Sequence, residues 1–175
     1  MQTPSSTSNE RPVQSTGCCP RFDPTPFEDK ELVWRDELFV KEHVRSLFHV
    51  PLNFGKRVVR ATAAIDAAGA QPDVQLMLSD ELSPWATDLY VHASKEVPGV
   101  TMVKLPGTYL TKVFEGPFSD APKWIEQMTK YVAARGKQLD KIYLGYTTCP
   151  ACAKAYGANY VVLFAKLRAG SSAAS

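Results

Sequence analysis

The stretch that decides the fold is residues 105–136, LPGTYLTKVFEGPFSDAPKWIEQMTKYVAARG. Its first part, residues 108–115, is typical of a strand, and Gly116 with the following proline breaks that strand. A helix follows, because Pro122 suits a first helical turn and Gly136 suits a helix end. Its apolar side chains recur at helical spacing and form one stripe: Trp124, Ile125, Met128, Tyr131 and Val132.

The same order of elements occurs on the N-terminal side of this stretch. Residues 32–40 alternate as a half-buried strand, and a helical pattern follows from Pro51 until Gly69 ends it. Residues 74–78 and 88–95 predict two more strands, separated by the polar turn SDELSP.

Two further strands, residues 141–146 and 160–167, follow the second helix. The chain therefore has the order strand–helix–strand–strand twice, and two such halves side by side would share one sheet and a central cleft. The predicted fold class is α+β.

Composition limits the partners. The chain has 175 residues and a formal net charge of +2, too balanced to favour nucleic acid or an anionic membrane surface. No run approaches the length of a membrane span, and the N-terminus lacks a secretory apolar segment, so we expect a cytoplasmic protein. The predicted domain covers residues 30–168, preceded by an arm at 18–29, with disordered tails at 1–17 and 169–175.

Residues 105–136 resemble the second half of the GyrI-like small-molecule-binding family: Pro, Gly, an aromatic-containing strand, Gly-Pro-aromatic, then an amphipathic helix ending at Gly. The resemblance implies a pseudo-twofold antiparallel sheet with two helices on one face and a central ligand cleft. It also implies relatives that bind drugs or that hydrolyse cyclopropane-bearing compounds. Many members carry Glu-x-Tyr on the penultimate strand; the matching place here is Leu144-Gly145-Tyr146, which keeps the Tyr and lacks the Glu.

Other carboxylates can supply the missing acid. Asp80 and Glu81 fall in the predicted turn, and at most one of two neighbours can enter a cleft. Glu115 shares a strand face with Tyr109 and is another candidate. A desolvated carboxylate has a raised pKa and can act as general acid or base, whereas the alternative is a solvated turn.

His92 shares its strand face with Asp88 and Tyr90, which suits proton transfer near neutral pH; the alternative is a mixed polar surface strand. We therefore predict catalytic roles for Glu81, Glu115 and His92.

Aromatic side chains are numerous, and several fall on predicted strands or turns, where flat walls would suit a planar ligand. The predicted ligand-binding residues are Trp34, Asp80, Trp85, Tyr90, Tyr109 and Tyr146. Core packing is the alternative for the aromatic members of this set.

The four cysteines occur as two pairs, Cys18 with Cys19 and Cys149 with Cys152. C-x-x-C is a usual zinc half-site, and we predict one structural zinc ion held by all four sulfurs. A thioredoxin-like redox pair fits the surrounding order of elements less well, and ordinary packing thiols are the remaining alternative.

Two functions fit these features. One is a hydrolase that adds water to a hydrophobic, electrophilic small molecule without a catalytic metal. The other is a protein that binds or sequesters a hydrophobic or aromatic small molecule. We place the hydrolase first, because the tandem unit leaves only short polar tails and no room for a DNA-binding module.

Overall fold

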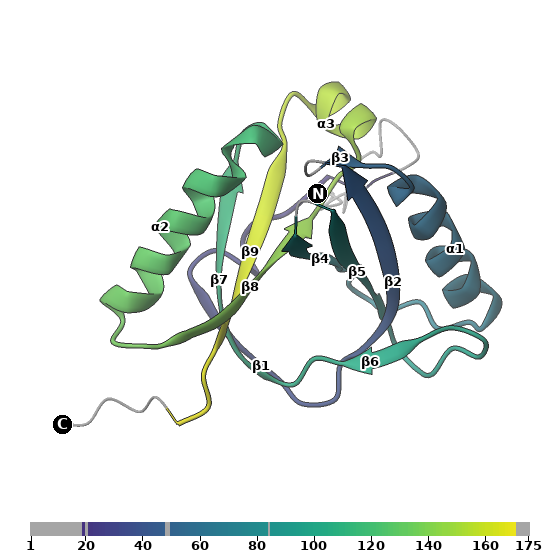
Figure 1. The fold of residues 1–175 in the computed structure, drawn as a ribbon, viewed down its shortest axis with the longest axis horizontal. Helices are drawn as coiled ribbons and strands as arrows, with labels where there is room; N and C mark the ends of the chain where they lie inside the picture. Colours follow the sequence, from purple (N-terminus) through teal and green to yellow (C-terminus); the bar gives the residue numbers. More distant parts are fainter. Residues whose placement is uncertain (1–18, 20, 48–49, 84, 171–175) are drawn as a thin grey trace, which may run out of the picture.

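The computed structural model describes residues 19, 21–47, 50–83 and 85–170 (Figure 1). The predicted tail at 1–17, Cys18 and the last five residues of the predicted C-terminal tail lie outside these residues. None of the helices in the described part of the chain is long and apolar enough to span a membrane.

The first half of the chain contains the predicted order with two additional strands. Its elements are β1 (Lys30–Trp34), β2 (Leu38–Leu47), β3 (Val50–Pro51), α1 (Phe54–Ala67), β4 (Met77–Ser83) and β5 (Ala86–Ala93). The additional strands are β1, before the predicted order, and the short β3, between β2 and α1. The helix ends as expected at Gly69, which has a φ of 59°, a conformation that glycine adopts at little cost.

The second half repeats this order. Its elements are β6 (Met102–Lys104), β7 (Gly107–Glu115), the short 3-10 helix η1 (Phe118–Asp120), α2 (Ala121–Ala134), β8 (Leu139–Tyr146), α3 (Pro150–Tyr156) and β9 (Tyr160–Leu167). The predicted duplication is β2–α1–β4–β5 followed by β7–α2–β8–β9, with α3 inserted between the last two strands.

The nine strands of the described residues form one antiparallel sheet in the order β1-β7-β9-β8-β4-β5-β2-β3, with β6 paired to β2. The two halves meet where β4 pairs with β8, through Leu78 opposite Gly145 and Ser79 opposite Leu144. The predicted α+β class with an antiparallel sheet is confirmed.

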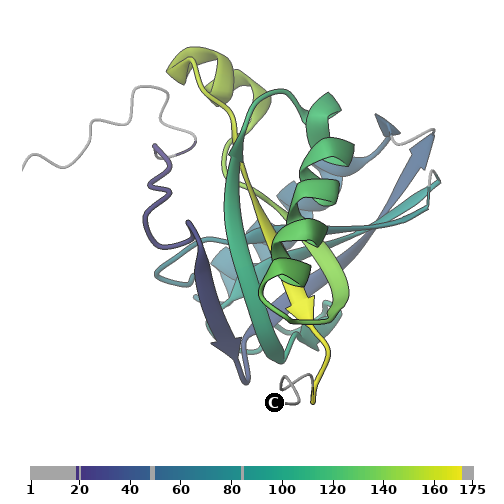
Figure 2. The ribbon, with the colours of Figure 1, turned by 90° about the vertical axis from the view of Figure 1, so that its left-hand side faces the viewer.

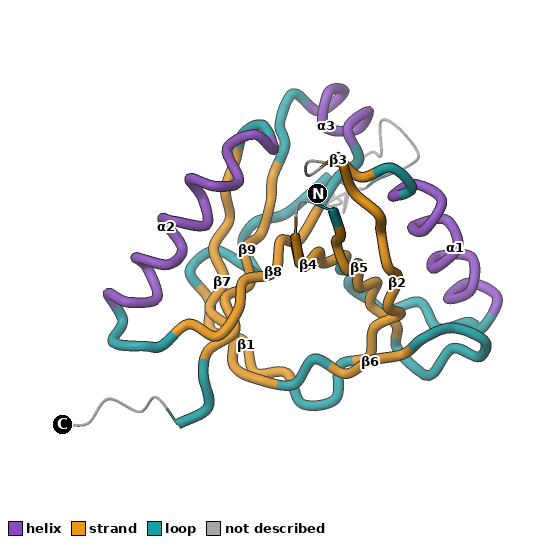
Figure 3. Tube along the Cα trace, in the orientation of Figure 1, coloured by secondary structure: helices purple, strands orange, loops and turns teal. Residues whose placement is uncertain are grey.

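The sheet is curled, and both long helices cover its outer, convex face (Figures 1 and 3). The predicted stripe of α2 buries Trp124, Met128 and Val132 against β7, β8 and β9. Helix α1 buries Ala61 and Ile65 against β2 and β5. These contacts hold each helix to its own half of the sheet.

The inner, concave face is packed with large side chains from both halves. They form one buried cluster: Phe27, Trp34, Phe39, Leu78, Tyr90, Leu105, Tyr109, Tyr143, Val162 and Phe164. Aromatic side chains of this size each remove on the order of 150–250 Å² from water, so this cluster is a second core.

The predicted strand over residues 32–40 is wrong as one element, because a turn divides it. The backbone N–H groups of Arg35 and Asp36 donate to the carboxylate of Glu37, at 2.8 and 3.2 Å. This turn sends β1 to pair with β7 at one edge of the sheet, while β2 pairs with β5.

The predicted turn SDELSP is also wrong, since β4 continues through it to Ser83. Asp80 is in register with Asp88 of β5, and Lys141 Nζ donates to the carboxylate of Asp80 at 2.6 Å. The Lys141 ammonium compensates the negative charge of Asp80, a residue type that is rare in strands. The two residues are 61 positions apart, so the local sequence does not reveal this contact.

The N-terminal arm, defined here as residue 19 and residues 21–29, leads into β1 beside β7 (Figure 2). The ring centroid of Phe22 lies 5.7 Å from that of Tyr160, and the ring centroid of Phe27 lies 5.8 Å from that of Phe164. Thr111 Oγ1 donates to the carbonyl oxygen of Phe27 at 2.8 Å. The arm therefore covers the inner face over β7 and β9.

Candidate functional site

Two carboxylates lie opposite each other on the inner face at the centre of the first half. Asp80 of β4 and Asp88 of β5 are cross-strand partners, and both are buried. They share their face with Leu78 and Tyr90 because side chains alternate along a strand. Like charges directly opposite each other repel, so this pair needs cations nearby.

Each aspartate has its own lysine. Lys41 Nζ lies 2.8 Å from Asp88 Oδ2, and Lys141 Nζ lies 2.6 Å from Asp80 Oδ2. Each ammonium also lies over a tyrosine ring, with Lys41 5.8 Å from the centroid of Tyr90 and Lys141 5.7 Å from that of Tyr143. The site thus contains two similar groups of carboxylate, ammonium and phenol.

A histidine completes one of these groups. His43 Nδ1 lies 3.0 Å from Asp88 Oδ1, across the β2–β5 pair. The His43 side chain is 58% exposed, whereas that of Asp88 is 8% exposed. A buried carboxylate therefore orients an imidazole that solvent and solutes can reach.

The environment sets the charges of these groups. Burial alone would raise the pKa of Asp88, but hydrogen bonds from Lys41 and His43 outweigh it and hold that pKa below its usual value. The hydrogen bond to Asp80 raises the pKa of Lys141. Burial raises the pKa of Tyr90 and of Tyr143, so both phenols stay protonated at neutral pH.

Sequence reasoning missed His43, because its partner lies 45 residues away along the chain. A usable signal exists in KEH, residues 41–43, where alternation places Lys41 and His43 on one face and Glu42 on the other. That signal becomes informative only with the register of β2 against β5.

The structure brings together some predicted ligand-binding residues. Trp34 and Tyr109 join Tyr90 in the inner-face cluster, with the ring centroids of Trp34 and Tyr109 4.5 Å apart. All three are buried among other side chains, and Tyr109 donates its hydroxyl proton to the carbonyl oxygen of Leu105 at 3.0 Å. Asp80 lies on the same face.

The other two aromatic candidates lie elsewhere. Tyr146 packs on the outer face, with its ring centroid 6.1 Å from Phe54 and 5.3 Å from Phe118, and its hydroxyl oxygen accepts from Ser79. Trp85 lies at the turn between β4 and β5 and is 53% exposed. Tyr146 therefore lies on the opposite face of the sheet from Trp34, Tyr90 and Tyr109.

The three predicted catalytic residues lie on three different parts of the sheet. Glu81 is exposed on β4, next to the buried Asp80. His92 of β5 lies with Nδ1 3.1 Å from the carbonyl oxygen of Val74. Glu115 ends β7 and is exposed.

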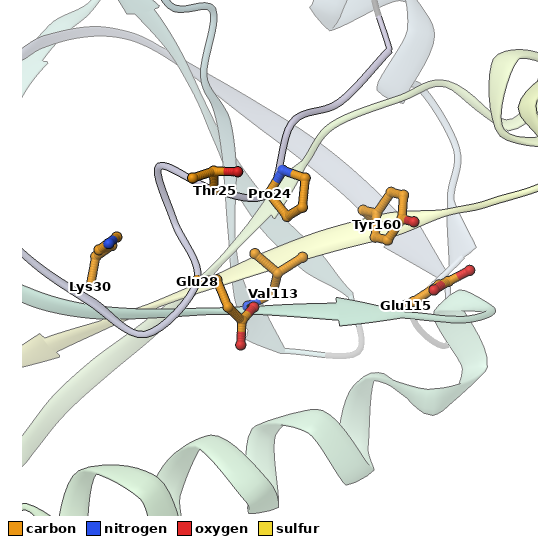
Figure 4. A pocket seen from close by; sticks show the side chains of 7 residues that line it. All are labelled: Pro24, Thr25, Glu28, Lys30, Val113, Glu115 and Tyr160. Atoms are coloured by element: carbon orange, nitrogen blue, oxygen red, sulfur yellow. The ribbon is translucent and has the colours of Figure 1, made fainter.

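Glu115 borders a shallow hollow of about 580 Å³ between the arm and the inner face (Figure 4). Pro24, Thr25 and Glu28 of the arm line one side together with Lys30, the first residue of β1, and Val113, Glu115 and Tyr160 of β7 and β9 line the other side.

Strand β8 places the position that the GyrI-like resemblance matches to a glutamate on the outer face of the sheet. Leu144, which occupies that place, faces the outer cluster under α2, whereas Tyr143 faces the inner cluster. Lys141, two residues before Tyr143, also contacts the inner-face aspartate Asp80. The residue of β8 that brings charge to the inner face is thus a lysine.

The cysteines form a second cluster. The sulfur atoms of Cys19, Cys149 and Cys152 all lie within 4.8 Å of one another. The predicted meeting of the arm with the C-x-x-C segment is confirmed for these three, and Cys18 lies outside the described residues.

Comparison with known proteins supplies independent evidence. A family model described as bacterial hydrolase matches residues 9–167. An uncharacterized conserved protein from Listeria innocua has a similar structure, with a TM-score of 0.61, 12% identity, and coverage of 81% of this chain and 92% of that chain. A hydrolase from Listeria innocua gives a TM-score of 0.60 at 14% identity, with the same coverage of 81% and 92%.

A further structure, that of SAV2435 bound to tetraphenylphosphonium, gives a TM-score of 0.50 at 12% identity, covering 82% of this chain and 94% of that chain. At these identities the structural likeness shows a shared fold. No curated protein sequence matches the chain.

Proposed function

The chain belongs to the bacterial hydrolase family, and from this premise we propose that it hydrolyses a hydrophobic, electrophilic small molecule at the inner face. The observation that carries the proposal is the contact between His43 and the buried carboxylate of Asp88, beside the Lys41 ammonium. A base oriented by a buried carboxylate next to a cation is suited to activate water.

The proposed reaction begins at His43. Its Nδ1 proton is directed at Asp88, so Nε2 holds the lone pair and accepts a proton from water. The water oxygen forms a bond to the electrophilic carbon, and the bond to the leaving group breaks. The imidazolium then returns the proton to the leaving group, so the net change is the addition of one water.

Lys41 and Lys141 would stabilise negative charge that develops on the leaving atom. Each ammonium already contacts a buried carboxylate, so its position is fixed before the substrate arrives. The surrounding rings of Tyr90 and Tyr143 give an apolar, planar environment. These features favour an uncharged substrate with a polarised carbon, such as an activated ester or a strained ring.

The finer family assignment is also part of this proposal. We assign the chain to the GyrI-like type, supported by the duplicated order of elements and by the helices on one face of the sheet. The sequence-based catalytic candidates Glu81, Glu115 and His92 stay as predictions, with Glu115 best placed to contact a ligand in the hollow beside the arm. Any zinc at the cysteine cluster would be structural, since Cys149 and Cys152 belong to a different part of the fold from the dyad formed by His43 and Asp88.

The test is incubation of the full chain with activated esters and strained-ring compounds, followed by mass spectrometry. We expect at least one compound to gain one water, at a rate that Asp88→Asn lowers by about 10²-fold or more. Glu42→Gln is the matched control, because Glu42 is a buried, ion-paired carboxylate on the opposite face of the same strand pair. Equal rates in wild type and Asp88→Asn would refute the dyad.

A non-catalytic binding protein is the second candidate. It is favoured by the number of aromatic side chains on the inner face and by the neighbour SAV2435, which binds tetraphenylphosphonium. In that case the same compounds would bind and be recovered unchanged, and Asp88→Asn would alter affinity without any reaction to measure.

A further inference from the structure

We propose that Cys19, Cys149 and Cys152 form a binding site for one zinc-class metal ion, and that this ion fastens the N-terminal arm to the segment between β8 and β9. The proposal goes beyond hydrolysis, and the dyad on β2 and β5 takes no part in it.

The geometry is close to that of a thiolate site. The three sulfurs lie within 4.8 Å of one another. A tetrahedral zinc ion with Zn–S bonds of about 2.3 Å holds its sulfurs roughly 3.8 Å apart, so shifts of about 1 Å would close the cluster onto an ion. The C-x-x-C spacing of Cys149 and Cys152 is a usual half-site for such an ion.

The backbone already directs donors at two of these sulfurs. Cys149 N–H donates to Cys19 Sγ at 3.4 Å, and Cys152 N–H donates to Cys149 Sγ at 3.5 Å. These contacts fix the orientation of both sulfurs, as hydrogen bonds around a metal site orient its ligands.

Contacts that do not involve sulfur hold Cys19 at this position. The Tyr156 hydroxyl, at the end of α3, donates to the carbonyl oxygen of Cys19. The Arg21 guanidinium lies 4.7 Å from the centroid of the Tyr156 ring. The third sulfur is therefore brought to the C-x-x-C pair by the packing of the arm itself, which a two-cysteine disulfide would not require.

A metal ion at Cys19 would hold the N-terminal arm in place. Beyond Cys19, Phe22 and Phe27 pack over β9, and the arm forms one wall of the hollow of about 580 Å³. An ion at Cys19 would anchor the start of this wall. Three thiolates occupy three positions of a tetrahedral ion and leave one position for a further ligand.

Metal content tests the site directly. The full chain is purified without chelator, and zinc is measured by elemental analysis in wild type, Cys19→Ser and Cys152→Ser. We expect about one zinc per chain in wild type and at least tenfold less in both variants. Ala155→Ser is the matched control, since it adds a hydroxyl to an exposed position of α3. Cys19→Ser protects the test against misfolding, because Cys19 is only half-buried whereas Cys152 is buried.

Two further measurements do not depend on activity. Cobalt(II) substitution should give a sulfur-to-cobalt charge-transfer band that Cys19→Ser weakens, and chelator should accelerate tryptic cleavage after Arg21, which is exposed. No bound metal after addition of zinc, or equal metal in wild type and Cys19→Ser, would overturn the proposal. A Cys149–Cys152 disulfide in protein analysed without reductant would overturn it as well.

Discussion

Strand β2 carries two ion-pair clusters on opposite faces, and they differ in where their partners come from. On the outer face, the buried Glu42 contacts Arg57 and Arg60, both on α1, at 3.0 and 3.4 Å. On the inner face, the buried Asp88 of β5 contacts Lys41 and His43, both on β2. One cluster joins a helix to the sheet, whereas the other joins two strands that already pair through their backbones.

The source of the partners gives the two buried carboxylates different roles: Glu42 holds a helix against the sheet, whereas Asp88 orients the imidazole of His43. Glu42 is covered by the helix that supplies its partners, so its hydrogen bonds position α1. The partners of Asp88 add little to a strand pair that the backbone ladder already holds. Exposure is the same in both clusters, because Lys41 and His43 are 34% and 58% exposed and Arg57 and Arg60 are 35% and 57% exposed. What distinguishes the inner-face cluster is the imidazole of His43, the side chain used most often for proton transfer.

The largest expected effect comes from removing the imidazole. His43→Gln should lower turnover by about 10²-fold or more, because glutamine cannot accept the water proton as a base. Arg57→Gln, the equivalent change on the outer face, should leave turnover at the wild-type level. Steady-state kinetics on the substrate found by mass spectrometry measures both, and a similar loss in both variants would remove the distinction between the two faces.

The second effect is on stability, and it compares the cations. Lys41→Met should cost about 2 kcal/mol, because it leaves the buried Asp88 with His43 alone. Arg57→Met should cost about 1 kcal/mol, because Glu42 keeps Arg60. Urea denaturation at pH 8 gives both free energies of unfolding. A larger loss in Arg57→Met than in Lys41→Met would mean that Glu42 relies more on a single cation than Asp88 does.

The third effect is the acid dependence of stability. The pKa of Asp88 is lower in the folded chain than in the unfolded one, so its contribution is present above the unfolded value of about 3.9. That contribution is lost as the pH falls through the lowered folded value. The thermal unfolding temperature of the wild type should therefore fall more steeply with decreasing pH below pH 4 than that of Asp88→Asn. Parallel curves would show that Asp88 is not stabilised as a carboxylate.

The smallest effect concerns Glu81, which is adjacent to Asp80 but exposed. Glu81→Gln should change the free energy of unfolding by no more than about 0.5 kcal/mol, the usual range for an exposed surface change. Its turnover decides between the sequence-based prediction and the dyad: a loss of about 10²-fold would restore Glu81 as a catalytic residue, whereas an unchanged rate favours His43.

Local patterns predicted much of the fold and only part of the site. The helical stripe of α2 and the alternation of β5 are period signals, and the helix and the strand lie where those signals indicate. Asp80, by contrast, falls in a predicted turn because its neighbours are polar, and only its contacts with Asp88 and Lys141 explain the longer strand.

The rest of the site could not be predicted because its contacts join strands that are far apart in sequence. His43 becomes a candidate catalytic residue only through its contact with Asp88. The inner-face position of Lys141 follows from the register of β8 and cannot be read from the residue types in that strand. The cysteine cluster was accessible from sequence because all the sulfurs occur in two short segments, which left few possible partners.

The pairing of β1 with β7 has a consequence for synthesis of the chain. Trp34 lies opposite Gly107, so β1 cannot find its partner until about 70 more residues have been made. At roughly 5–20 residues per second, the ribosome takes about 4–15 s to supply them. During that interval the first half can form its own hairpins, but Phe39 and Tyr90 lack the inner-face neighbours Tyr109, Tyr143 and Phe164. A nascent chain stalled before β7 should therefore engage chaperones that recognise exposed aromatics, and one stalled after β9 should not.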